Sequence, residues 1–492
     1  MCCGEIRHTS IDEGRYAFDK ADGVFEREDT LAVSSQSPSL IDRLLVNRNF
    51  AFLWVGDVIS ALGDYSFGIT MTLWIVVVIA KGQPWAALAI TGLVLSGTIP
   101  PMIVGLFAGV FVDRWDHRLT MMIVDLIQAA LVGVLIATTF LPGGQLQTVW
   151  QLALIYLVNF LLVSVDQFYN QAGFPLIGDI VPERDFARAM GRVLVFVSIG
   201  TILGPSIGAP LFIVFGPRYA LLINAVSFLV SFALILPIRP PQTEVQPQAS
   251  ESAEEAQAQA EPKKRAFLPE FIEGLRFLFG HRTLRTMLIA MIIETLGTAA
   301  LPVVNVFFVI QNLHASTALY GLLVTAIGVG ALVGSIFCPR IVNRWGEARV
   351  FWACLYADGI GLVIYSRLTN YIPAVIIIFL LGIVTGLFNV AIGPLILRLT
   401  PRNMMGRGTA VRVSLISTAD ILGAVAAGFL VSDALRHLHI SVLGTVFTPV
   451  DSILLVAGVF ALLSGIYAMR NVFEPEPESV ATPVTATEAS GE

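Results

Sequence analysis

Long apolar stretches separated by short polar segments dominate the chain between about residue 50 and residue 470. Most hold about 20 residues or more, the length that an α-helix needs to cross the ~30 Å hydrocarbon core of a bilayer. The pattern therefore predicts twelve transmembrane helices. Their predicted limits are 50–80, 85–112, 119–141, 148–172, 193–215, 219–237, 284–310, 319–342, 350–366, 372–397, 408–431 and 446–470.

Three polar segments lack the apolar residues that a folded core requires. Residues 1–40 and 472–492 form charged or Ser- and Thr-rich ends, and residues 239–266 are rich in Pro, Gln, Ala and Glu. Such compositions bury too little apolar surface to offset the entropy lost on ordering. We expect two disordered cytoplasmic tails and a disordered cytoplasmic linker.

Two further segments indicate helices that lie outside the membrane core. Apolar residues recur at helical spacing through 267–283, which predicts an amphipathic helix on the membrane surface. Residues 41–49 are typical of a short interfacial helix. The remaining chain divides into an N-terminal six-helix bundle, 41–238, and a C-terminal six-helix bundle, 284–471.

The two halves resemble each other in sequence. The matching pairs are ISALGD at 59–64 with IETLGT at 293–298, VDRW at 112–115 with VNRW at 342–345, and ILG at 202–204 with ILG at 421–423. Three short matches in the same order indicate a parallel duplication. The predicted fold class is therefore an all-α membrane protein, with twelve transmembrane helices in two six-helix pseudo-repeated bundles.

Composition agrees with a membrane protein and excludes several other classes. The chain is 55% hydrophobic and 13% charged, whereas soluble domains carry about 25% charged residues. It has no basic stripe for nucleic acid, and its six histidines show no metal-ligand spacing beyond His437 and His439. Cys2 and Cys3 are either a spare terminal pair or an acylation site. No metal and no cofactor is expected.

The distribution of Lys and Arg predicts the orientation in the membrane. Cytoplasmic loops carry an excess of these residues. If both termini are cytoplasmic, the outer loops hold only Lys81, Arg218, Arg367 and Arg436, and all other loop Lys and Arg residues lie inside. We expect a multi-pass protein of the cell membrane with both termini in the cytoplasm.

A charged hairpin between the second and third helices has the sequence GLFAGVFVDRWDHR, residues 105–118. Small residues lead into alternating charges, and a new apolar run follows directly. We interpret it as a cytoplasmic gate, in which Asp113 lies near the positive N-terminal end of the eleventh helix around 407–408. The predicted gate residues are Gly109, Asp113, Arg114 and Arg118.

Acidic residues within the apolar stretches are candidates for function, because a charge in the hydrocarbon core is costly. Asp57 and Asp64 lie seven residues apart on one face of the first helix, and Asp64 and Glu294 lie near mid-depth. Burial favours the neutral carboxyl group, so such a group can bind and release a proton as water access changes. We nominate Asp64, Glu294, Asp166 and Asp57 for proton coupling.

The alternative for each acid is a purely structural pairing with a buried hydroxyl or arginine. Asp358 and Asp420 also lie mid-span, and Arg412 is a possible partner of Asp420. Polar residues near mid-span are candidates for binding substrate. We nominate Gln167, Asn170, Asn305 and Asn389.

The fifth helix contains GTILGPSIGAP, residues 200–210. Gly200, Gly204 and Gly208 recur every four residues and form a flat stripe that a second helix can approach closely. Pro205 removes a backbone hydrogen bond and permits a bend. The simpler interpretation is that these residues only allow close helix packing. This interpretation and a functional role of the stripe and bend do not exclude each other.

These motifs resemble those of the major facilitator superfamily of transporters, across about residues 41–470. GVFVDRWDHR is similar to the family signature after the second helix, although Asp116 replaces the usual glycine and His117 the usual arginine. GTILGPSIGAP resembles the antiporter signature of the fifth helix, which the family associates with export. LLVNRNFAFLWVGDVISALGDYSF and FIEGLRFLFGHRTLR look like the twelve-span drug:proton antiporter branch, with its macrolide and enterobactin exporters.

The resemblance implies a secondary transporter that exports a hydrophobic or amphipathic small molecule against a proton flow by alternating access. The fourth helix lacks the arginine that many drug:proton antiporters use, so Asp64, Glu294 or Asp166 must do more of the proton transfer. An importer or uniporter of the same fold stays open as an alternative. A phosphate-binding loop of an ATP-driven pump is absent, and no catalytic cluster indicates an enzyme. Expected partners are a small-molecule substrate, protons and the lipid bilayer, and the expected form is a monomer.

Overall fold

The computed structural model describes residues 46–112, 114–140, 148–239, 267–401, 404–434, 440–442 and 445–472. Apart from turns and one hairpin, the described chain is helical. The hairpin pairs β1 (Ile440–Val442) with β2 (Thr445–Phe447) in antiparallel register. Asp113 and the predicted tails and linker lie outside the described residues, except for Arg239 and Val472 at their edges.

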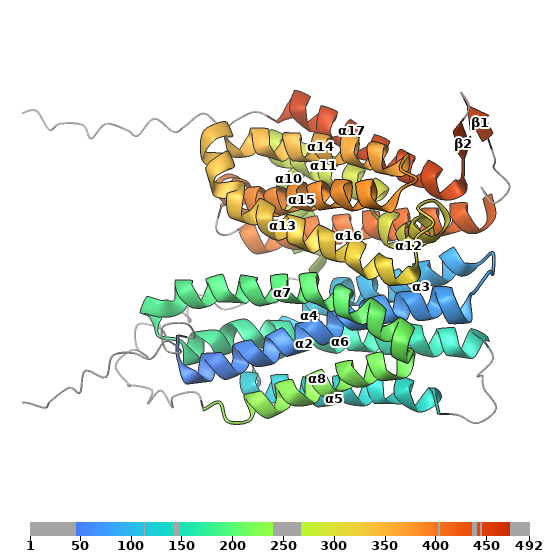
Figure 1. The fold of residues 1–492 in the computed structure, drawn as a ribbon. Helices are drawn as coiled ribbons and strands as arrows, with labels where there is room; N and C mark the ends of the chain where they lie inside the picture. Colours follow the sequence, from blue (N-terminus) through green and yellow to red (C-terminus); the bar gives the residue numbers. More distant parts are fainter. Residues whose placement is uncertain are drawn as a thin grey trace, which may run out of the picture. The chain divides into compact units, whose positions relative to one another are not determined.

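The first half of the chain forms a set of helices that we call the N-terminal bundle (Figure 1). It comprises α2 (Arg48–Leu73), η1 (Trp74–Ile79), α3 (Ala86–Ile103), α4 (Gly105–Val112), α5 (His117–Thr138), α6 (Thr148–Ile180), α7 (Glu183–Phe215) and α8 (Pro217–Ile235). η1 is a π-helical continuation of α2. The second predicted helix is divided at Val104, shortly after Pro100 and Pro101, because two prolines remove two backbone donors from the helix.

The second half forms the C-terminal bundle and one shorter helix before it. The shorter helix is α10 (Phe267–Gly280). The bundle comprises α11 (Arg282–Thr298), α12 (Leu301–Gln311), α13 (Thr317–Trp345), α14 (Glu347–Ser366), α15 (Tyr371–Leu399), α16 (Met405–Phe429), η3 (Leu430–Ala434) and α17 (Pro449–Asn471).

Within the described residues, 12 helices are long and apolar enough to cross a membrane, with α11 and α12 counted as one. They coincide with the twelve predicted stretches, which confirms the predicted fold class. Some limits differ from the prediction. α6 extends to Ile180 through the mainly apolar residues 173–180. α7 already begins at Glu183, because the charged and polar residues of 183–192 are helical ahead of the apolar run.

Two predictions about helix limits differ from the structure. In the predicted interfacial helix over 41–49, Val46 has a positive φ of 59° and Asn47 is extended, so these two residues are not helical, whereas residues 41–45 lie outside the described residues. Asn47 instead caps α2, accepting a hydrogen bond from the Phe50 amide at 2.7 Å. The last helix begins at Pro449 rather than at residue 446, where β2 lies, and Thr448 caps it.

The sequence repeat reappears as a repeat of helix contacts. A Cβ atom on Gly63 of α2 would meet Ser227 and Asn224 of α8 at 2.2 to 2.6 Å. A Cβ atom on Gly297 of α11 would meet Phe460 and Ala457 of α17 at 2.8 to 3.2 Å. The first and sixth helices of each half therefore pack through matching glycines.

The third repeat segment behaves in the same way. A Cβ atom on Gly204 of α7 would lie 2.4 Å from the Tyr65 Cβ and 3.3 Å from the Leu62 carbonyl oxygen. Its counterpart Gly423 of α16 faces the Leu296 carbonyl oxygen at 2.5 Å and the Ala299 Cβ at 2.7 Å. Position by position, the fifth helix of each half packs on the first in the same register.

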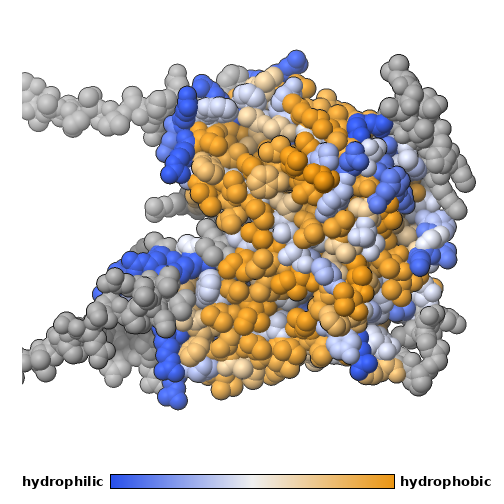
Figure 2. Space-filling view, in the orientation of Figure 1, coloured by the Kyte–Doolittle hydropathy of each residue, from blue (hydrophilic) through white to orange (hydrophobic). Residues whose placement is uncertain are grey.

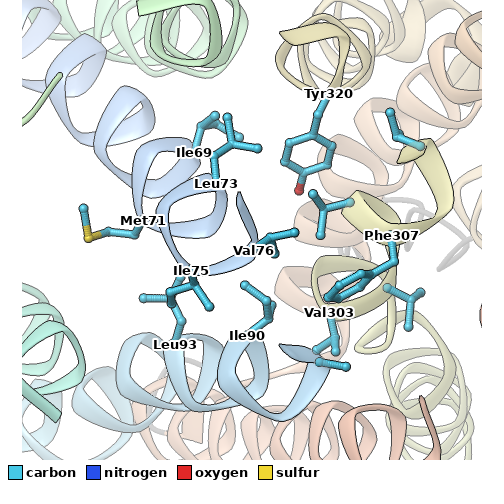
Figure 3. Packing of buried hydrophobic residues seen from close by; sticks show 14 of the residues in the cluster. Ile69, Met71, Leu73, Ile75, Val76, Ile90, Leu93, Val303, Phe307 and Tyr320 are labelled. Carbon is cyan, nitrogen blue, oxygen red and sulfur yellow. The ribbon is translucent and has the colours of Figure 1, made fainter. Parts of the chain in front are cut away.

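One large apolar cluster joins both bundles at one end of the helices, which we call the sealed end. It contains residues of η1 and the start of α3 together with residues of α12 and the start of α13. Figure 3 shows Leu73 and Val76 on one side of this contact and Tyr320 and Phe307 on the other. Val76, Tyr320 and Phe307 are all at most 8% exposed, so the bundles are in dry contact here.

The opposite end bears the hairpins after α4 and α13, and we call it the hairpin end. No apolar cluster of the described residues joins the two bundles there. Among the described residues, one buried cluster around Phe50 and Leu176 lies wholly in the N-terminal bundle. The clusters around Phe351, Val411 and Val350 lie in the C-terminal half. Figure 2 shows an apolar belt across the middle of the visible face, with hydrophilic residues at both ends.

Candidate functional site

A cavity of about 470 Å³ lies within the N-terminal bundle, between the middle of the helices and the hairpin end. Helices α2, α5, α6 and α7 supply its walls. The lining residues are Asp57, Ser60, Ala61, Asp64, Tyr65, Met121, Gln128, Asp166, Tyr169, Asn170, Gly173, Phe174, Ile177, Met190 and Val193. The lining combines three carboxyl groups with aromatic and Met side chains, and none of these lining residues is Lys, Arg or His.

Asp64 lies near the midpoint of the span formed by α2 and η1, and its side chain is exposed to the cavity. The neighbouring Tyr65 is 39% exposed. α2 can present both side chains because its other faces pack on α7 and α8 through glycines. This arrangement places a solvent-accessible carboxylate at mid-depth, where a membrane protein otherwise avoids charge.

Asp57 lies two helical turns from Asp64 on the same face of α2. The hydroxyl group of Tyr169 on α6 donates a hydrogen bond to the Asp57 Oδ1 at 2.6 Å. The same hydroxyl lies 3.5 Å from the Ser231 hydroxyl of α8. Asp57 is therefore linked to two other helices by hydroxyl groups.

Asp166 lies on α6, across the cavity from α2. The Asn170 amide donates to the Asp166 Oδ2 at 2.6 Å, and Gln128 of α5 is a second hydrogen-bonding neighbour. Asp166 is close enough to Asp64 for their charges to interact. Two carboxyl groups so placed repel each other when both are charged, and a bound cation or proton relieves that repulsion.

Asp125 is a member of this acidic group that our sequence prediction missed. It lies on α5, is 0% exposed, and interacts electrostatically with Asp57 and Asp166. The sequence contains the signal that identifies it, an acid within an apolar stretch, since Asp125 is the one acid within the predicted third helix, 119–141. Gln128, one helical turn later, is 4% exposed and was missed in the same way.

The C-terminal bundle contains the other acidic candidates, and they lie apart from the cavity. Glu294 on α11 is half-buried and close enough to Asp358 on α14 for their charges to interact. Asp420 on α16 accepts a hydrogen bond from the Thr98 hydroxyl of α3 at 3.2 Å, which ties the two bundles together. The ion pairs found among the described residues include none between Asp420 and Arg412.

The four polar residues predicted to bind substrate are dispersed. Asn170 lines the cavity, whereas Gln167 faces α4, with its Oε1 3.4 Å from a Cβ built on Gly105. Asn305 is 5% exposed and accepts a hydrogen bond from the Tyr365 hydroxyl at 2.6 Å. Asn389 is exposed on α15 and does not line the cavity.

The charged hairpin is held together by its own polar residues. Asp116 caps α5, accepting from the Leu119 amide at 2.7 Å, and His117 approaches Asp179 of α6 at 3.4 Å. Arg118 donates to the Ile235 carbonyl at 3.3 Å and to the Leu236 carbonyl, at the end of α8. The two departures from the family signature thus have structural roles.

Other parts of the predicted gate are less tightly packed than we expected. A Cβ on Gly109 would lie 3.9 Å from the Gln171 Oε1, an ordinary contact distance, so α4 does not require glycine there. Arg114 is exposed, and Asp113 lies outside the described residues. Arg407, at the start of α16, pairs with Glu273 of α10 at 2.8 Å.

The glycine stripe of α7 contacts α2 within its own bundle. Cβ atoms on Gly200 and Gly208 would lie 2.8 Å from Ala61 and Ser66 of α2. The opposite side of α7 faces the C-terminal bundle, where a Cβ on Gly321 of α13 would fall 2.3 Å from the Pro205 carbonyl oxygen. The stripe therefore positions the helix that carries Asp57 and Asp64.

Comparisons with known proteins agree with this architecture. The family described as transmembrane secretion effector matches residues 44–477. An uncharacterized MFS-type transporter of Bacillus subtilis, YkuC, is 24% identical over 370 residues, which cover 73% of this chain and 80% of that protein. The multidrug efflux pump Tap of Mycolicibacterium fortuitum is 25% identical over 375 residues, covering 72% and 85%.

The fold also has solved relatives. A bacterial homologue of the iron transporter ferroportin, crystallised in an inward-facing state, is similar with a TM-score of 0.64. The similarity covers 87% of this chain and 100% of the other at 13% sequence identity, so it concerns the fold alone.

The fold and the family match define a multi-pass membrane transporter. The chain belongs to the transmembrane secretion effector family, within the major facilitator superfamily. The resemblance stated from the sequence motifs is confirmed. Among the described residues, no group of three or more His, Cys, Asp or Glu side chains is placed to hold a metal ion.

Proposed function

We propose that this transporter exports amphipathic small molecules in exchange for protons. The observation that carries the proposal is the cavity, where the exposed Asp64 lies at mid-depth among aromatic side chains. A group that can be either charged or protonated in such a site can bind cargo and protons in turn. The similarity to pumps named for multidrug efflux supports the same direction of transport.

The lining of the cavity favours positively charged cargo. Asp57, Asp64 and Asp166 line it, and none of the described lining residues is basic. Tyr65 and Phe174 add aromatic faces that attract cations and apolar groups. We therefore infer that the preferred cargo is a lipophilic cation, with Asn170 as a polar contact.

The orientation follows from the loop charges. We place the hairpin end in the cytoplasm, because Arg114, Arg118, Arg344 and Arg349 lie there. Both chain termini are then cytoplasmic, and the sealed end faces outward. A cavity that is accessible from the cytoplasm corresponds to the state in which an exporter loads its cargo.

The hairpin supplies the gate in this proposal. Here Arg407 pairs with Glu273, so the start of α16 is engaged with α10. We propose that closure towards the cytoplasm brings the hairpin, with Gly109, Asp113 and Arg114, onto the start of α16, while Arg118 stays anchored to α8. Asp113→Asn should slow transport, and a variant that transports as fast as the parent contradicts this gate.

The direction of transport and its coupling to protons can be tested together in proteoliposomes that contain the purified full-length chain. The probe is tetraphenylphosphonium, a permanent cation that an acidic lumen does not trap, with the membrane potential clamped at zero. Antiport predicts accumulation in an acidic lumen and its loss on adding an uncoupler. Accumulation in an alkaline lumen identifies a symporter, and equilibration without accumulation identifies a uniporter.

A pair of matched variants tests whether accumulation of the probe depends on the cavity. Asp64→Asn should abolish accumulation, whereas Glu183→Gln, which neutralises an exposed acid at the start of α7, should not change it. A neutral and an anionic amphiphile of similar size test the preference for cations. Equal transport of all three probes would contradict the assignment of cargo charge.

A further inference from the structure

Among the described residues, Asp125 is the acid of the N-terminal bundle with the least exposed surface. It is 0% exposed, and neither carboxyl oxygen has a hydrogen-bond partner among the described residues. It does not line the cavity. A charged carboxylate in such a place would lack both water and donors, so this environment strongly favours the neutral carboxylic acid.

Among the described residues, no positively charged group interacts with Asp125. The groups that interact with it are Asp57 of α2, Asp166 of α6 and the Ser231 hydroxyl of α8. Asp64 of α2 also lies within electrostatic range. The nearest basic residue along α5 is Arg118, whose guanidinium donates to the carbonyl groups at the end of α8. The described groups that interact with Asp125, on α2, α6 and α8, are therefore acids and one hydroxyl group.

A row of hydroxyl groups connects Asp125 with the cavity. Ser231 approaches Asp125, Tyr169 lies 3.5 Å from Ser231, and Tyr169 donates to the Asp57 Oδ1 at 2.6 Å. Each hydroxyl group has a single proton to donate. Because Tyr169 donates its proton to Asp57, Ser231 is the donor in its 3.5 Å contact with Tyr169. The Ser231 oxygen is then left to accept the proton of Asp125 when the two side chains meet during transfer.

We propose that Asp125 is the proton-carrying residue of the transport cycle and exchanges its proton with Asp57 through Ser231 and Tyr169. The proposal rests on the proton coupling proposed above. Cargo and proton then occupy different acids of one bundle: the exposed Asp64 faces the cargo, and the buried Asp125 holds the proton. Repulsion among the carboxylates couples the binding of cargo at Asp64 to the release of the proton from Asp125.

One proton moves in net terms from Asp125 to Asp57, and four oxygen-bearing groups take part in its transfer. The O–H bond of Asp125 breaks as its proton passes to Ser231, the Ser231 proton passes to Tyr169, and the Tyr169 proton passes to the Asp57 carboxylate. Both hydroxyl groups end with one proton each, Asp125 becomes a carboxylate, and Asp57 becomes a neutral acid that can release its proton into the cavity. Uptake reverses every step.

The first test does not depend on transport. Infrared difference spectroscopy of the full-length protein, titrated with acid and base, should contain the C=O band of a buried neutral carboxylic acid. Asp125→Asn should remove that band, whereas Asp185→Asn, a change at the hairpin-end surface, should keep it. Retention of the band in Asp125→Asn overturns the proposal, even if the transporter proves to be proton-coupled.

The second test measures coupling. The parent should release close to one proton for each tetraphenylphosphonium bound, and Asp125→Asn should bind the probe with proton release reduced at least several-fold. The same variant should still exchange probe across the membrane without accumulating it. Full accumulation by Asp125→Asn overturns the inference, whereas a parent that never responds to a pH gradient overturns the proposed function instead.

A milder variant covers the case in which Asp125→Asn does not fold. Tyr169→Phe keeps the ring and removes the hydroxyl group that joins Ser231 to Asp57. It should slow gradient-driven accumulation while leaving equilibrium binding of the probe close to that of the parent. Unchanged coupling in Tyr169→Phe would exclude this route for the proton.

Discussion

In the N-terminal bundle, Gly63 and Gly204 bring α8 and α7 onto α2. In the C-terminal bundle, Gly297 and Gly423 bring α17 and α16 onto α11 in the same register. The helix contacts are thus shared between the halves. Duplication has preserved the positions where backbones approach, since any side chain larger than hydrogen would collide there.

The polar chemistry of the two halves differs. Asp57, Asp64 and Asp166 line a cavity in the N-terminal bundle, with Asp125 buried beside them, whereas Glu294 and Asp358 lie together in the C-terminal bundle away from it. A repeat therefore constrains packing more strongly than it constrains function. We expect cargo binding and proton coupling to depend mainly on the N-terminal bundle, and alternating access to depend on both bundles.

The largest expected effect is on transport, and it compares an acid of the N-terminal bundle with an acid of the C-terminal bundle. Asp64→Asn should lower gradient-driven accumulation by roughly 100-fold or more, because it removes the carboxylate that faces the cationic cargo, and the loss of one partner of such a charge pair costs about 2–5 kcal/mol. Glu294→Gln, a second candidate for coupling, should have a smaller effect, because Glu294 does not line the cavity. Initial rates in proteoliposomes, normalised to the amount of inserted protein, provide the comparison. A larger loss in Glu294→Gln would reverse our assignment of the halves.

The next effect tests the shared packing. Gly204→Val and Gly423→Val should each destabilise the protein by about 1–3 kcal/mol or more, because their Cβ atoms would meet backbone or Cβ atoms at 2.4 and 2.5 Å. Thermal unfolding of the purified protein measures the change. Gly133→Val is the control, since nothing lies within 4 Å of a Cβ there. Strongly unequal losses at the two positions would contradict a symmetric repeat of contacts.

A smaller effect concerns the contact between the bundles. Thr98→Val removes the donor to Asp420 with little change of shape, and a typical hydrogen bond contributes about 0.5–1.5 kcal/mol. The balance between inward- and outward-open forms should shift by roughly two- to tenfold away from the form described here. Spin-label distances between α3 and α16 can detect the shift. Thr98→Ser, which keeps the hydroxyl group, should restore the parent distribution.

The smallest effect distinguishes the two hairpins. Asp116 caps α5, whereas the corresponding Gly346 before α14 has no side chain to do so. Asp116→Ala should cost about 1 kcal/mol of stability, and Asp116→Asn should cost much less because asparagine also caps helices. Thermal unfolding again provides the measurement. Equal stability of the Ala and Asn variants would show that the cap is unimportant.

The class of fold and its internal repeat can be predicted from the order of the amino acids alone. Apolar runs of membrane-spanning length identify helices without reference to the rest of the chain, because the bilayer sets the required length. The same runs identified Asp57, Asp64 and Asp166, since acids within them are rare, and the same rule applied to the third helix would have identified Asp125. Short matches between the halves located the glycines that pack equivalent helices.

Which side chains share a cavity depends on how the helices pack against one another. Successive residues of a helix point about 100° apart, so Asp166 faces the cavity while Gln167 faces α4. The rotation of each helix depends on its neighbours, and this removed Gln167 and Asn305 from the cavity and brought in Gln128. The sealed end is likewise a property of packing, because Val76, Phe307 and Tyr320 come from different helices that a sequence pattern alone does not bring together.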